Sequence, residues 1–148
     1  MQLEFSAVIP ASPGLVFALL TDLDQHPKIF RQIKRIERLT PAPYGVGTRY
    51  REIRQFGRCE AAEEFFVEAL TPPQRLLLVC VSRGVRYESD FTLIADHPHF
   101  TTIKLVFRSR PIAFMGWLLS PLSFFMTGTV RSCIEQDLRD LHAAAATA

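Results

Sequence analysis

Between residues 34 and 110 the chain alternates strand-length segments with short turn sequences, and this pattern restricts its possible folds most strongly. The segments are residues 34–40, 48–56, 60–70, 75–82, 85–95 and 101–110. Glycines mark several of the connections, as at Gly45, Gly47, Gly57 and Gly84. Parallel strands would need crossovers of about a dozen residues or more, so neighbouring segments must pair in antiparallel fashion.

The last two of these segments indicate which face of the sheet is covered. Alternation places apolar residues on one face of each strand. In residues 85–95 they are Val85, Tyr87, Phe91 and Leu93, and in residues 101–110 they are Ile103, Leu105 and Phe107. Charged residues occupy the opposite face: Arg86, Glu88, Lys104 and Arg108. An antiparallel sheet of this kind packs on one side only, so the rest of the chain must supply the cover.

Helical segments flank the strands at both ends. Residues 2–9 read as a first strand, and Ser12-Pro13 then forms a strong helix start, with an N-cap followed by proline. Residues 22–27 should break this helix, and residues 28–33 are expected to add a short second turn. Residues 112–142 carry a broad apolar stripe at helical spacing, in which Pro121 should introduce a kink. Residues 143–148, almost all alanine, are expected to fray.

The segment from residue 111 to 130 contains no charged side chain over about the length that spans a bilayer. Glycine, serine, threonine and proline dilute its apolar character, and the sheet needs a helix to cover its apolar face. We therefore expect a helix clasped by the sheet. A peripheral membrane contact through Phe114, Met115, Trp117 and Leu118 stays open as an alternative.

Composition and motifs exclude several classes of function. The net charge is +2 with acidic and basic residues mixed along the chain, which argues against nucleic acid as a partner. The cysteines, at 59, 80 and 133, lack metal-ligand spacing, and His97 with His99 is too small a set for zinc, so we expect no metal. No phosphate loop or dinucleotide fingerprint is present, so no cofactor is expected either. Reduced thiols and the lack of a signal-like N-terminus favour the cytoplasm.

Several local phrases resemble the SRPBCC superfamily, which includes START-related lipid-transfer domains, polyketide cyclases and the birch-pollen-allergen fold. They are residues 8–13 with 16–22, residues 45–50, residues 64–76 and residues 137–142. The resemblance covers essentially the whole chain. It implies a single α+β domain over residues 1–142 with the helix-grip fold: a curved antiparallel sheet of about seven strands wrapped around a long C-terminal helix, with two short helices after strand one.

The same resemblance implies that the chain binds or transports a hydrophobic or amphipathic small molecule, or a lipid, in an internal pocket. The alternatives are a polyketide cyclase or dehydratase acting on an aromatic polyketide-like substrate, and a membrane- or protein-interaction module. The superfamily shares no universal catalytic motif, so no catalytic residue is assigned and enzyme activity stays open.

Candidate ligand contacts follow from strand alternation and the helical stripe: Tyr50, Glu63, Phe65, Tyr87, Phe91, Phe107, Phe125 and Thr129. An inward Glu63 would be a desolvated carboxylate with a raised pKa, although it could also lie at the wetter end of its strand. Either face of residues 48–56 carries charge, so this strand lines the polar end of a pocket or forms an exposed edge. Tyr87 could donate to a ligand or simply pack.

Overall fold

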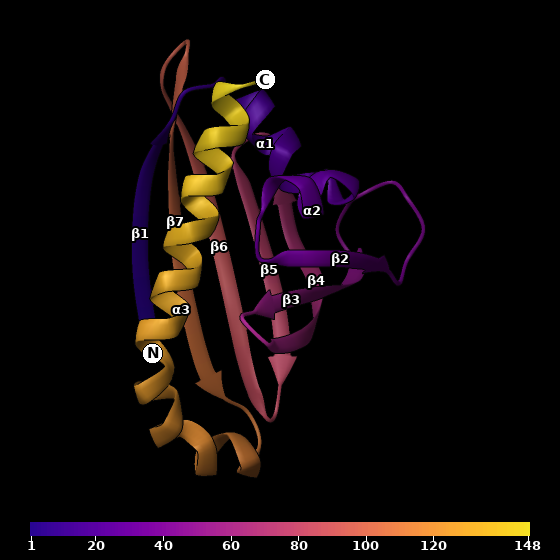
Figure 1. Cartoon of the computed structure of the whole chain (residues 1–148), viewed down its shortest axis with the longest axis vertical. Coiled ribbons are helices and arrows are strands. Elements are labelled where there is room, and N and C mark those ends of the chain that lie inside the picture. The colour runs from indigo at the N-terminus through magenta and orange to yellow at the C-terminus, as the bar shows by residue number, and fades with distance from the viewer.

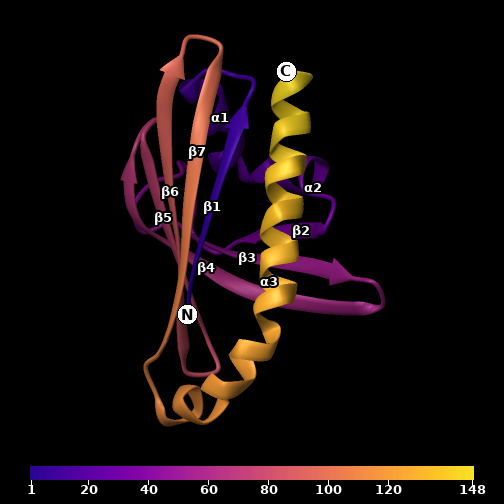
Figure 2. The same cartoon turned by 90° about the vertical axis from the view of Figure 1, so that its left-hand side faces the viewer.

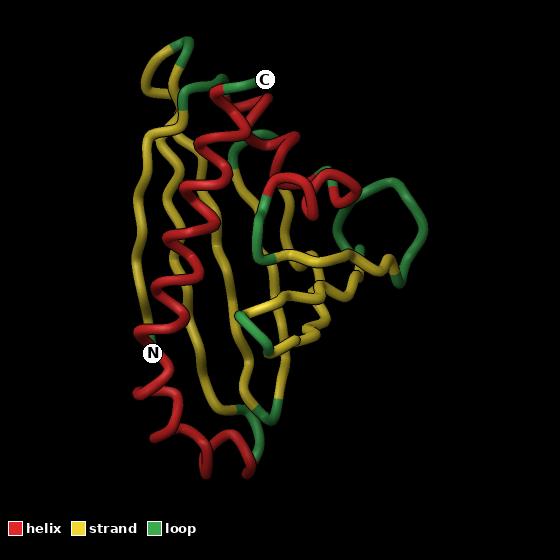
Figure 3. Tube along the Cα trace, viewed as in Figure 1, coloured by secondary structure: helices red, strands yellow, loops and turns green.

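A computed structural model gives the backbone of all 148 residues and the side chains of residues 1–55, 57–114 and 128–148. The order of elements along the chain is shown in Figures 1 and 3. The strands are β1 (Gln2–Ile9), β2 (Ile33–Arg38), β3 (Arg49–Phe56), β4 (Cys59–Thr71), β5 (Arg75–Ser82), β6 (Val85–His97) and β7 (Phe100–Pro111). The helices are α1 (Pro13–Thr21), the 3₁₀ turn η1 (Leu23–Gln25), α2 (His26–Ile29) and α3 (Phe114–Ala146).

The strands form one antiparallel sheet in the order β1-β7-β6-β5-β4-β3-β2. The first strand therefore pairs with the last, and α1, η1 and α2 lie in the connection between the two edge strands of the sheet. Figure 2 shows the sheet curving, with α3 standing along one face and β3 and β4 sweeping across toward it. This is the α+β helix-grip arrangement expected from the sequence.

The register of β6 and β7 confirms the predicted faces of the sheet. Tyr87 lies opposite Ser109 and Phe91 opposite Leu105, on the side of α3, whereas Glu88 pairs with Arg108 on the convex side. The alternation also predicts that Arg86, Glu88, Lys104 and Arg108 are exposed, and this is confirmed only for Lys104. The other three are half-buried because Arg86 pairs with Glu68 and Glu88, and Glu88 also lies 3.9 Å from Arg108.

A β-bulge changes the predicted face of β4. The pairing of β4 with β5 shifts between Val67 and Ala69, so the extra residue rotates the end of the strand. Leu70, opposite Leu76, takes the inward position that alternation gives to Ala69. No turn residue marks this point in the sequence, so strict two-residue alternation does not predict the bulge.

The helices begin and end close to, but not always at, the expected positions. Ser12 caps α1, because its hydroxyl accepts a hydrogen bond from the Leu15 amide, as predicted. The second helix comes earlier than expected: α2 spans His26–Ile29 and contains Pro27 in its first turn, where a missing amide costs nothing. Ile33, assigned to this turn from the sequence, instead begins β2.

The long helix differs from the expectation at its C-terminal end. The helix continues to Ala146 rather than ending in a frayed tail, because Ala145 is only 3% exposed and belongs to the hydrophobic core. The kink expected at Pro121 falls outside the residues whose side chains are described. Among the described residues, no helix combines the length and the apolar character needed to cross a bilayer.

The hydrophobic core lies at one end of the molecule, between the sheet, α1 and the C-terminal part of α3. Its central side chains are Ile9, Val16, Leu20, Leu76, Leu93, Ile103 and Leu141. The buried hydroxyl of Thr101 closes this end by donating to the carbonyl of Ala11 at 2.8 Å. The hydrophobic effect therefore secures α3 at its C-terminal end.

Farther along α3, ion pairs join the helix to the rest of the protein. Arg54 of β3 donates two hydrogen bonds to Asp137, at 3.1 and 2.7 Å, and a third to Glu52 at 2.8 Å. About one helical turn from Asp137 toward the C-terminus, Asp140 accepts hydrogen bonds from the backbone amide and the guanidinium of Arg31, at 3.0 and 3.1 Å. Bidentate pairing of this kind fixes both distance and orientation.

The Arg54 network generates a stability prediction. Replacing Arg54 by methionine leaves the carboxylates of Glu52 and Asp137 with little solvent and no cation, since the Asp137 side chain is only 25% exposed. We expect a loss of about 3–5 kcal/mol in the free energy of unfolding, measured by urea denaturation. Lys34→Met, which breaks an exposed pair with Glu60, should cost no more than about 1 kcal/mol. Equal losses in the two variants would contradict a special role for Arg54.

Candidate functional site

The concave face of the sheet changes character in steps along its strands. Nearest α1 lies an apolar row with Leu93 and Ile103, followed by a row with Phe91 and Leu105. In the next row Ser89 lies opposite Phe107, and in the row after that Tyr87 lies opposite Ser109. This last row continues across the neighbouring strands through Cys80 of β5, Phe65 of β4 and Tyr50 of β3. Glu52 and Glu63 face each other one pair beyond Tyr50. The face is thus apolar at its closed end and polar at the other.

Two stacked aromatic pairs form the middle of this face. The rings of Tyr50 and Phe65 lie 5.6 Å apart and nearly parallel, and those of Tyr87 and Phe107 are 6.0 Å apart. Tyr50 is buried, whereas Phe65, Tyr87 and Phe107, like Phe91, are only half-buried although they point toward α3. Large aromatic side chains in a packed interior would be covered completely, so this part of the face is not closed by the described residues.

The polar end is built around Arg54. Burial alone would lower the pKa of Arg54, but Glu52 and then Asp137 outweigh this effect and raise it above its ordinary value. The guanidinium therefore stays charged, with its donors directed at Glu52, Asp137 and the side chain of Gln32. From the sequence, this strand could either line the polar end of a pocket or form an exposed edge of the sheet. The structure assigns β3 to the interior of the sheet, with Tyr50, Glu52 and Arg54 inward.

Glu63 occupies the inward position that alternation suggested. Desolvation, followed by the charge of Glu52, raises the pKa of its carboxyl, and Arg54 only partly offsets this. The side chain nevertheless remains accessible to solvent. The two observations are compatible if Glu63 lies in a concavity, where protein surrounds the carboxylate without touching it on every side. A carboxyl in this setting can hold a proton closer to neutral pH than an ordinary surface glutamate can.

Three further titratable groups lie near Glu63. Burial raises the pKa of Tyr87, and the charge of Glu63 adds to the effect. Burial also raises the pKa of Cys80 to about 12, again reinforced by Glu63, whose carboxylate oxygen is 4.0 Å from the Cys80 sulfur. The pKa of Cys133, on α3, is raised by burial as well. At neutral pH the tyrosine and the thiols are therefore neutral hydrogen-bond donors rather than nucleophilic anions.

The contribution of α3 differs from the prediction. Phe125 lies outside the described side chains, and Thr129 is exposed. Helical geometry puts Val130, Ile134, Asp137 and Leu141 on one face, with Leu141 in the core and Asp137 bound to Arg54. Val130 therefore points toward the sheet and is half-buried. Val130, Cys133 and the Arg54 network are the site residues that sequence reasoning did not select. The apolar stripe predicted for residues 112–142 included Val130 and Cys133, but the side on which they lie becomes clear only from the ion pair between α3 and β3.

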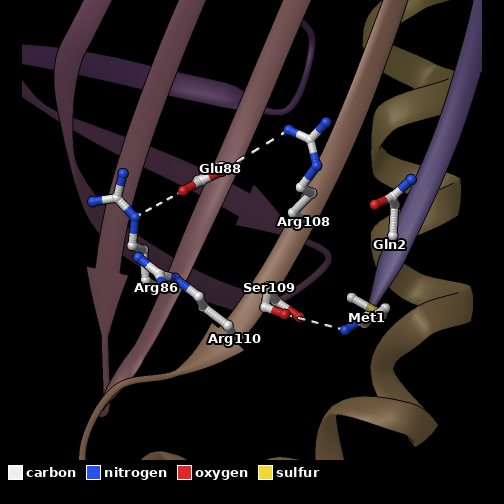
Figure 4. Close-up of a pocket in the computed structure, with 7 residues that line it drawn as sticks. All are labelled: Met1, Gln2, Arg86, Glu88, Arg108, Ser109 and Arg110. Carbon is white, nitrogen blue, oxygen red and sulfur yellow. Dashed lines mark hydrogen bonds and ion pairs between the residues drawn. The ribbon is translucent and has the colours of Figure 1, made fainter.

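Depressions of the described surface also lie away from the concave face. One, of about 580 Å³, lies on the convex side and is lined by Arg86, Arg108, Arg110, Glu88 and the N-terminal residues (Figure 4). Another, of about 720 Å³, lies between α1, α2 and the end of α3, beside Arg31 and Asp140. Neither groups aromatic and titratable side chains as the concave face does. In the described part of the chain no cluster of three or more potential metal ligands occurs.

Comparison with known proteins supports the fold. No family model and no curated protein matches the sequence. Among solved structures, the Zhui aromatase/cyclase from Streptomyces sp. R1128 superposes with a TM-score of 0.77 at 16% identity, covering 98% of this chain and 93% of that one. Ara h 8.0201 gives 0.75 at 13% identity, covering 100% and 99%. The protein TTHA0849 from Thermus thermophilus gives 0.68 at 21% identity, covering 97% and 99%.

Glu63 gives the site a testable pH dependence. Its pKa is higher in the folded chain than its ordinary value of 4.5, so ionising it costs stability, and this cost develops as the pH rises through the folded-state pKa. Glu63→Gln avoids the cost. Thermal unfolding should show the variant matching the wild type at pH 4 and exceeding it at pH 7.

Glu60, on the same strand, serves as the matched control. Its pKa is lowered by the hydrogen bond from Lys34, so Glu60→Gln should be slightly less stable than the wild type at pH 7, a difference of the opposite sign. A stability difference for Glu63→Gln that does not change with pH would show that this carboxyl is not desolvated in the folded protein.

Proposed function

We propose that the chain binds a hydrophobic or amphipathic small molecule between the concave face of the sheet and α3, and acts as its carrier or sensor. The observation that carries this proposal is the half-buried state of Phe65, Tyr87, Phe91 and Phe107, which point inward without being covered. Ligand sites in proteins combine apolar walls with a few placed polar groups, and this face has that composition.

The arrangement favours a ligand with two chemically distinct ends. Its apolar body would lie along Phe91 and Phe107, toward the closed core. Its polar end would meet Glu63 and the hydroxyl of Tyr87, which offer an acceptor and a donor within one neighbourhood. Cys80 and the buried Arg54 network form the floor beneath these groups. Such a ligand resembles a lipid or an extended aromatic compound more than a sugar or a nucleotide.

The fold and the chemistry of the chain agree with this proposal. The helix-grip fold is shared with the Zhui aromatase/cyclase and with Ara h 8.0201, each of which superposes over nearly the whole length of both chains. The described cysteines are free thiols, which suits the reducing cytoplasm where we propose that the protein acts.

A polyketide cyclase or dehydratase is the second candidate function. Glu63 favours it, because a carboxyl with a raised pKa near a neutral tyrosine can act in general acid–base catalysis, which cyclisation of a polyketone needs. Incubation with a linear aromatic polyketide analogue distinguishes the two functions. A cyclase forms a product and loses this activity in Glu63→Gln, whereas a carrier binds the analogue unchanged.

Filling the space beside α3 tests the binding proposal. Val130→Trp would place an indole on the helix face that looks toward the sheet. We expect this variant to bind the amphipathic fluorophore 1-anilinonaphthalene-8-sulfonate about tenfold more weakly or worse, measured by fluorescence titration. Because the wall is open there, its melting temperature should remain close to that of the wild type. A close-packed wall would instead lose roughly 1–3 kcal/mol to overpacking.

Ser132→Trp is the matched control. Ser132 is exposed and lies on the opposite side of α3 from Val130 and Leu141, so its indole would remain in solvent. This variant should bind the fluorophore as the wild type does. Equal affinities in Val130→Trp and Ser132→Trp would place the fluorophore elsewhere on the protein and contradict the proposal.

A further inference from the structure

One end of the molecule brings together two segments that are distant in the sequence. The turn between β5 and β6 lies beside the connection from β7 to α3, because the amides of Ile112 and Ala113 both donate to the carbonyl of Gly84, at 2.9 and 3.3 Å. Figures 1 and 2 show both segments at the end of the molecule opposite α1 and the C-terminus. We call residues 81–84 and 110–114 the arginine edge.

The arginine edge exposes large apolar side chains. Phe114 is 79% exposed, Val81 54% and Ile112 50%. Single exposed apolar residues are ordinary on protein surfaces, but these three belong to two segments joined by hydrogen bonds. The hydrophobic core, at the other end of the sheet, cannot cover them.

The arginine edge itself carries net positive charge. Residues 81–84 and 110–114 contain two arginines, Arg83 and Arg110, and no aspartate or glutamate. Both arginines are exposed, and neither forms an ion pair with any described side chain. Arg110 also lies directly opposite Arg86 in the ladder of β6 and β7, as Figure 4 shows. Arg86 is paired with Glu68 and Glu88, so Arg83 and Arg110 are the arginines of this region that remain available to an external anion.

The backbone at Arg83 adopts a conformation that is uncommon for arginine. Arg83 and Gly84 connect β5 and β6 as a two-residue turn, with φ angles of 51° and 76°. Both positive angles identify a type I′ turn, whose first position favours asparagine, aspartate or glycine. An arginine in the left-handed region is strained, and strained residues concentrate at functional positions. Asparagine would therefore fit this position more easily than arginine.

We propose that the arginine edge docks the protein on an anionic lipid bilayer. Phe114 and Ile112 enter the interfacial layer, while Arg83 and Arg110 lie over the negatively charged headgroups. This combination of apolar side chains and cations on one edge matches the two sources of interfacial membrane affinity. The polar end of the concave face begins directly beside the edge, since Val85 pairs with Pro111 of the edge and Tyr87 pairs with Ser109, the residue before Arg110. Docking would therefore bring the open end of the proposed ligand site to the lipid surface.

Vesicle co-sedimentation tests this proposal without any knowledge of the ligand. The wild type should bind vesicles of phosphatidylcholine mixed with phosphatidylserine, more weakly at high salt, and bind pure phosphatidylcholine poorly. Arg110→Gln and Arg83→Asn should each weaken binding to the mixed vesicles about fivefold. Arg83→Asn should at the same time raise the melting temperature, because asparagine fits the turn. A purely structural arginine would not separate stability from lipid affinity in this way.

Matched controls come from other exposed positions. Arg58→Gln removes an exposed arginine without an ion pair from the turn between β3 and β4, and Phe100→Ser removes an exposed aromatic from the far end of the sheet. Both should bind mixed vesicles as the wild type does, whereas Phe114→Ser should lose about tenfold.

Three results would overturn the proposal: no binding of the wild type to mixed vesicles, equal binding by Arg110→Gln, or an arginine-dependent dimer seen by light scattering in place of vesicle binding. Fluorophore binding in solution should be unchanged in all these variants, so a failure of docking is distinguishable from a failure of the proposed ligand site.

Discussion

The guanidinium of Arg54 is the contact on which the functional part of the structure depends. It joins Glu52 of its own strand to Asp137 of α3 and so ties the helix to the sheet, while the Arg31–Asp140 pair ties the helix to the connection between α2 and β2. Among the described residues of α3, the hydrophobic core packs on its C-terminal part, near α1. Farther from the core, the ion pair between Arg54 and Asp137 joins the helix to the sheet, beside the face where we propose that a ligand binds.

Along α3, the part that stabilises the fold is therefore separate from the part that faces the proposed ligand site. At the closed end, Leu141 and Ala145 of α3 complete a core with α1 and the sheet. At the open end, half-buried aromatics and a desolvated Glu63 face the helix. Half-buried aromatic rings and a desolvated carboxylate contribute little to folding, which is consistent with the binding role that we propose for this face.

The elements that local sequence rules govern were predictable. The two-residue alternation of β6 and β7 gave their inward faces, and Ser12-Pro13 gave the start of α1. Features that depend on distant partners were not. The bulge after Val67 has no local signal, the alanine tail is ordered only because Ala145 meets the core, and Arg54 and Asp137 are 83 residues apart. For Glu63, strand alternation left an inward position and the wetter end of the strand both open, and its raised pKa depends on desolvation and on Glu52 of the neighbouring strand, which no local pattern indicates.

Native mass spectrometry of the freshly purified protein tests the central claim most directly. If the space between the sheet and α3 binds an amphipathic small molecule, part of the protein should carry one such molecule, with a mass excess that disappears on denaturation. The bound fraction should fall sharply in Val130→Trp and persist in Ser132→Trp. A spectrum with only the ligand-free mass, together with no binding of added lipids or aromatic compounds to the wild type, would contradict the account.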